Sequence, residues 1–71
     1  MNKMQKIFSE RLREVMEERG LKQQQLADTI GYRQSIVCNW LNGKSFPMGA
    51  SLYALGTRLG VNIDWLLGLV E

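Results

Sequence analysis

The stretch QQQLADTIGYRQSIVCNWLNGK, residues 23–44, is the most informative part of this chain for its fold. Apolar residues recur at helical spacing over residues 22–30 and again over residues 34–41. Ala27 lies where a second helix must cross the first closely, because a larger side chain there would hold the two helices apart. Gly31 separates the two patterns and can adopt the positive φ that a sharp turn needs. This stretch therefore predicts two short helices joined by a tight turn.

Three further segments with helical periodicity flank this pair. The first contains Phe8, Leu12, Val15 and Met16 on one face, opposite a charged face. Asn62 is a suitable N-cap for the last of them. In chain order, the predicted helices cover residues 4–19, 22–30, 34–41, 49–59 and 63–67. Because no segment shows the strict alternation of a half-buried strand, we predict an all-α fold, a compact domain of five helices over residues 1–71.

Composition excludes most catalytic chemistry for this chain. The 71 residues include no His, which removes the commonest general base and the commonest nitrogen ligand for metals. A lone Cys38 cannot close an internal disulfide or anchor a zinc site. We therefore expect no enzyme activity, no metal and no cofactor.

Charge is concentrated in the middle of the chain. The formal net charge is +2 overall. Residues 20–60 contain four basic side chains and one acidic side chain, which gives this part +3. The four are Lys22, Arg33, Lys44 and Arg58, and the acidic residue is Asp28. This distribution favours an anionic partner for the region that contains the two central helices.

The sequence resembles the lambdoid-phage repressor and Cro-type helix-turn-helix family. Gln23, Ala27, Gly31, Val37 and Trp40 fall at the spacing of that family's motif, here residues 23–42. The ending LGVNIDWLLG, residues 59–68, looks like the family's closing helix. The resemblance implies a lambda-repressor-like fold whose third helix lies in the major groove of double-stranded DNA.

The resemblance also implies which residues contact DNA. Positions that face outward on the third helix are expected to touch base edges, and Gln and Asn amides can pair with adenine. These base-contacting candidates are Gln34, Ser35, Cys38 and Asn39. The candidates for phosphate contacts, which fix register without reading sequence, are Gln23, Arg33, Asn42 and Lys44.

Three residues keep more than one interpretation. Cys38 fits a passive small residue, a contact in the groove, or an oxidation-sensitive thiol. Tyr32, in the turn, fits either a phosphate donor or a cover for the core. Gln24 fits either an ordinary polar helix start or a DNA contact.

The sequence departs from the family's pattern at two places. Many relatives pair an Arg in the first helix with a Glu late in the third, where this chain has Met16 and Leu41. We infer that an apolar contact replaces the ion pair, and that affinity relies more on other cations such as Lys44 and Arg33. Gly56 stands where relatives usually place Ala, at a cost in helix propensity of up to ~1 kcal/mol unless close packing requires it.

One recognition helix reads only a few base pairs, so we expect a homodimer that binds a palindromic operator. The candidate dimer surface is the last helix and its surroundings, where the alternative is that Trp65 and Leu66 complete the monomer core. Its residues are Ile63, Trp65, Leu66 and Leu69.

These observations favour a transcriptional repressor of Cro type, from a phage or prophage, with no small-molecule ligand. The alternative is an antitoxin-type module that binds a partner toxin as well as DNA. No signal peptide or membrane span is visible, and a single unpaired Cys suits a reducing interior, so we expect a cytoplasmic location without membrane association.

Overall fold

The computed structural model describes residues 2–71, and its first helix is α1 (Lys3–Arg19). The helix begins at Asn2, whose Oδ1 accepts a hydrogen bond from the Gln5 N–H at 2.8 Å. The Gln5 Oε1 in turn accepts from the Asn2 N–H at 3.1 Å. This reciprocal capping pair satisfies N–H groups that a helix start otherwise leaves to water. The helix ends at Gly20.

The tight turn lies between α2 (Gln23–Ile30) and α3 (Gln34–Leu41). Gly31 has a φ of 78°, the left-handed conformation that the sequence predicted for it. The Tyr32 N–H donates to the Ala27 carbonyl at 2.9 Å, which closes the end of α2. Ala27 itself is fully buried, as a close crossing of the two helices requires. The bounds predicted for the second of these helices match the structure, and the first starts one residue later than predicted.

The fourth helix changes its winding halfway along. An α-helical part, α4 (Gly49–Ala54), continues directly into a π-helical part, η1 (Leu55–Leu59), where the sequence predicted one α-helix over 49–59. The Gly60 N–H donates to the carbonyl of Leu55, five residues back. Gly56 lies in the wider part, and a Cβ on it would lie 3.2 Å from Ile63 Cγ1. Close packing against Ile63 therefore accounts for the glycine, whose low helix propensity also weakens α-helical winding here.

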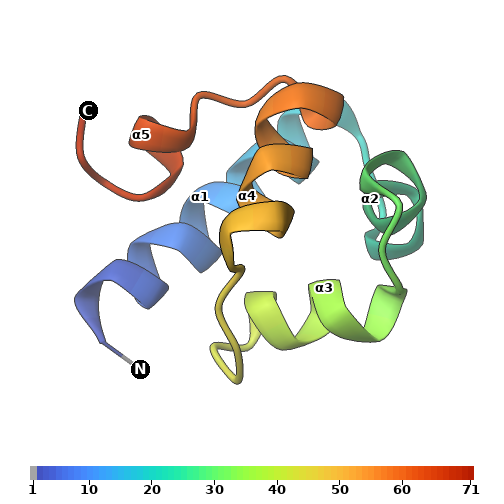
Figure 1. Ribbon diagram of the computed structural model, residues 1–71, viewed down its shortest axis with the longest axis horizontal. Coiled ribbons are helices and arrows are strands. Elements are labelled where there is room, and N and C mark those ends of the chain that lie inside the picture. The colour runs from blue at the N-terminus through green and yellow to red at the C-terminus, as the bar shows by residue number, and fades with distance from the viewer. Residues whose placement is uncertain (1) are drawn as a thin grey trace.

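The last helix, α5 (Ile63–Leu66), lies beside the first half of α1, and the chain end curls around it (Figure 1). Asn62 is its N-cap, as predicted, and accepts from the Trp65 N–H at 3.2 Å. Leu66 is fully buried. The helix therefore closes the core on the side opposite α2.

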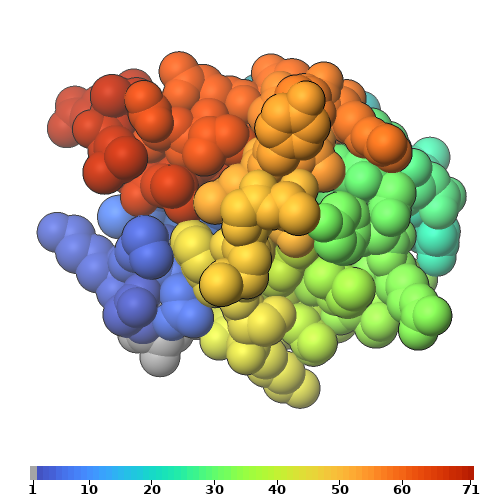
Figure 2. Space-filling model, viewed as in Figure 1, coloured from blue at the N-terminus to red at the C-terminus, as the bar shows by residue number. Residues whose placement is uncertain are grey.

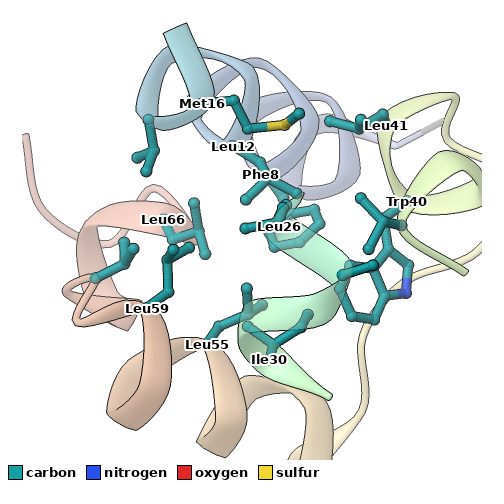
Figure 3. Close-up of a cluster of buried hydrophobic side chains, with 14 of the residues drawn as sticks. Phe8, Leu12, Met16, Leu26, Ile30, Trp40, Leu41, Leu55, Leu59 and Leu66 are labelled. Atoms are coloured by element: carbon teal, nitrogen blue, oxygen red, sulfur yellow. The ribbon is translucent and has the colours of Figure 1, made fainter. Parts of the chain in front are cut away.

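The core is shared by all of these helices (Figure 3). Its fully or nearly fully buried side chains include Phe8, Leu12, Leu26, Ile30, Val37, Leu55 and Leu66. The body around it measures 26 × 23 × 23 Å. Within residues 2–71 the fold is all-α, with five helices and no strand, which confirms the predicted fold class. None of the helices described is both long and apolar enough to cross a membrane.

Candidate nucleic-acid interface

The two sides of α3 differ in the way that the sequence predicted. Val37, Trp40 and Leu41 are buried, so one side of the helix belongs to the core. The Trp40 ring meets the Phe8 ring edge-on at a centroid distance of 6.2 Å and lies tilted against Tyr32 at 5.8 Å. Such aromatic contacts have defined geometry as well as buried area. The orientation of α3 is therefore fixed by packing from behind.

The opposite side of α3 presents polar groups to solvent. Gln34, Ser35 and Asn39 are exposed, and Cys38 is half-buried among them. The α3 segment is the green to yellow-green part of the molecule at the lower right of Figure 2. The structure thus brings the predicted base-contacting residues together on one uncovered face.

The Cys38 thiol has a partner on its own helix face. Asn42 Nδ2 donates to Cys38 Sγ at 3.3 Å, a contact between residues one helical turn apart. The thiol carries no disulfide. Asn42 therefore links the exposed polar face of α3 to the turn that follows the helix, and its side-chain amide donates to the sulfur.

Cationic residues stand at both ends of α3. Arg33 is the residue immediately before the helix, and Lys44 follows it in the turn; both side chains are exposed. The Lys44 N–H donates to the Asn39 carbonyl at 2.9 Å, which fixes the turn against the helix. Gln23 is half-buried at the first position of α2. Three of the predicted phosphate-contacting residues, Arg33, Asn42 and Lys44, therefore lie at or just beyond the two ends of α3, and Gln23 lies at the start of α2.

Tyr32 is half-buried and packs on Trp40, so its ring covers the core. Gln24 is exposed and its Nε2 donates to Asp28 Oδ1 at 2.8 Å. This bond occupies Gln24 on the surface of α2.

The sequence alone did not point to Arg13. Its Nη2 donates to the Leu41 carbonyl at 3.3 Å, at the end of α3. It also lines a surface hollow of about 270 Å³ between α1, the start of α2 and the end of α3. The full lining is Arg13, Met16, Glu17, Gly20, Leu21, Lys22, Gln23 and Leu41. Its spacing in the sequence could have pointed to it. Arg13 precedes Met16 by three residues, so the two share one side of α1.

Met16 and Leu41 are both buried and point toward each other (Figure 3). They form an apolar wall of the hollow. An apolar pair thus joins α1 to α3 where the sequence led us to infer one.

The candidate dimer residues differ in exposure, and one requires correction. Leu66 is fully buried in the core, because α5 turns it toward Phe8 and Leu55 (Figure 3), so its side chain completes the core and is not on the surface of the chain. Ile63 and Trp65 are half-buried. Leu69 is 72% exposed. Further exposed apolar side chains, which the sequence pattern did not indicate, are Met4, Met48, Tyr53 and Val70.

Two helices joined at a tight glycine turn, with the second presenting an uncovered polar face, define a helix-turn-helix domain. A model of the helix-turn-helix domain family matches residues 9–71 of this chain, and the chain belongs to that family. It is also similar to a transcriptional regulator from Listeria innocua of known crystal structure, with 31% sequence identity and a TM-score of 0.77. The match covers 90% of this chain and 60% of that regulator, so this chain spans less than two thirds of its length. No curated protein matches the chain.

Proposed function

We propose that this protein is a sequence-specific, double-stranded DNA-binding transcriptional regulator whose α3 enters the major groove. The observation that carries the proposal is the exposed face of Gln34, Ser35 and Asn39 on a helix held rigidly by Trp40. Side-chain amides offer a donor and an acceptor together, the pattern that pairs bidentately with adenine. Arg33 and Lys44 at the two ends of α3 supply charge for the flanking phosphates. Membership of the helix-turn-helix family and the similar Listeria regulator support it.

The finer form of the proposal is a Cro-type repressor of phage or prophage origin. Residues 1–71 act as a single reading unit that occupies an operator and excludes polymerase, through binding and without catalysis. The family resemblance of residues 23–42 and 59–68 supports this assignment. Its ligand is DNA, and it needs no cofactor.

We further propose that two copies bind a palindromic operator, with their α3 helices in successive major grooves about 34–36 Å apart. Ile63, Trp65 and Leu69 supply the contact surface between the copies, and Leu66 supports them from the core. The 72% exposure of Leu69 supports its assignment to this surface.

Selection of bound duplexes from a random DNA pool tests the proposal. The expected result is an enriched consensus with two inverted half-sites, whose spacing reports the symmetry of the complex. Recovery of no preferred sequence would contradict sequence-specific binding. A second small protein that co-purifies in equal amounts and blocks DNA binding would favour the antitoxin alternative instead.

A further inference from the structure

Arg13 connects the first helix to the end of the third through a single hydrogen bond. Its Nη2 donates to the carbonyl of Leu41, the last residue of α3, at 3.3 Å. The backbone N–H groups that follow α3 donate instead to the carbonyls of residues 38–40. A helix end leaves such carbonyls open and carries partial negative charge, so a guanidinium is well placed there. This contact holds the Arg13 side chain at a defined place on the surface.

The same side chain faces the start of α2. Arg13, Lys22 and Gln23 all line the hollow whose apolar wall is formed by Met16 and Leu41. Its charged lining residues are two cations and Glu17, which leaves a net charge of +1. A guanidinium has five N–H donors in a planar fork, and the bond to Leu41 engages one of its terminal nitrogens. The remaining donors can meet an anion beside Gln23.

We propose that Arg13 is a DNA phosphate-binding residue that acts beside Gln23. This inference rests on the proposed function, and it assigns a backbone contact to α1, outside the helix-turn-helix motif itself. Arginine suits the role because its fork can bind phosphate with two parallel hydrogen bonds. Because the Leu41 carbonyl already restrains the side chain, less conformational freedom is lost when phosphate binds. By binding both the Leu41 carbonyl and a phosphate, Arg13 fixes the position of α3 relative to the DNA backbone.

The test compares the full chain with Arg13→Gln, Arg13→Lys and a matched control, Arg19→Gln. Arg19 is also on α1 and also donates to a carbonyl at a helix end, that of Leu59. That end of η1 lies at the top of Figure 1, across the molecule from α3. The control therefore removes one positive charge and one hydrogen bond to a helix end, as Arg13→Gln does, but at a site distant from the proposed DNA-binding face. Affinity for a selected duplex is measured by fluorescence anisotropy at several salt concentrations, and folding is checked by thermal melting.

Arg13→Gln should weaken binding to specific and unrelated duplexes by the same factor. The slope of log K against log salt should fall in magnitude by about 0.9 for each phosphate that the variant no longer neutralises. Arg19→Gln should lower the melting temperature and leave that slope unchanged. A lowered melting temperature with an unchanged slope for Arg13→Gln would show a purely structural role and overturn the inference.

Arg13→Lys keeps the test decisive if Arg13→Gln does not fold. It retains the charge but lacks the fork, so the salt slope should persist while affinity falls. Affinity equal to that of the unchanged protein at every salt concentration would overturn the inference. Failure of the unchanged protein to bind any duplex would overturn the proposed function, a result distinct from either Arg13 outcome.

Discussion

The guanidinium of Arg11 lies over the ring of Trp65, 5.0 Å from its centroid. The same group donates to the carbonyls of Trp65 and Val70. One side chain of α1 therefore holds both α5 and the last residues of the chain. Because residues 11 and 65 are far apart in sequence, this contact fixes the position of the segment that carries the candidate dimer surface.

Replacing Arg11 with Ala should destabilise the fold by about 1–3 kcal/mol, because two carbonyls lose a charged donor and the ring loses its cation. Chemical denaturation followed by circular dichroism measures this loss. The neighbouring exposed Glu10→Gln serves as the control and should change stability by no more than about 0.5 kcal/mol. Equal stability of the two variants would show that the Arg11 contacts contribute nothing.

Gly31→Ala should destabilise the protein by about 1–2 kcal/mol, because φ at this position is 78° and a side chain there is strained. The added Cβ would also lie 2.8 Å from Arg58 Nη1, although that flexible side chain can move away. Gly49→Ala is the matched control, since it begins α4 with no atom within 4 Å of the added Cβ. It should be neutral or stabilise by up to about 1 kcal/mol. Similar melting temperatures for both variants would contradict the turn geometry.

Met16→Arg should destabilise the protein by about 3 kcal/mol, the scale of a buried charge without a partner. Adding Leu41→Glu should recover most of this loss, because the two side chains point toward each other and can form an ion pair. A double-mutant cycle from denaturation curves gives the coupling energy. Additive losses would show that the two positions do not interact.

Local patterns were enough to predict most of the fold. The apolar spacing and the glycine stops placed α3 correctly and the other helix ends within one residue, because tertiary packing agrees with local preference there. The π-helical winding of η1 was missed, and so was the close approach of Ile63 to Gly56 across the following turn. Periodicity within one helix carries no information about such an approach.

The candidate interface was predicted less completely than the fold. Helical geometry alone separated the outward Gln34 and Asn39 from the inward Trp40. It did not reveal the Arg13 bond to Leu41, because that contact joins residues 28 positions apart. Burial of Leu66 likewise depends on how α5 docks onto α1, so an apolar residue expected at a dimer surface belongs to the core.

Gln34 and Lys44 have different proposed roles: Gln34 is proposed to read a base, and Lys44 is proposed to contact a DNA phosphate. Both side chains are exposed, near opposite ends of α3, so either can be truncated without opening the core. Gln34→Ala should relax discrimination at one base position by about 1–3 kcal/mol and leave affinity for unrelated sequences unchanged. Lys44→Ala should weaken all sequences alike and reduce the salt slope by about 1.

The most direct test of sequence reading by α3 compares the unchanged protein with Gln34→Ala. The affinity of each is measured at fixed salt for a selected operator and for every single-base variant of that operator. We predict that the Gln34 variant loses discrimination at one position of each half-site and keeps it at the others. A uniform loss across all duplexes, or no loss at any of them, would contradict the assignment of α3 as the helix that reads sequence.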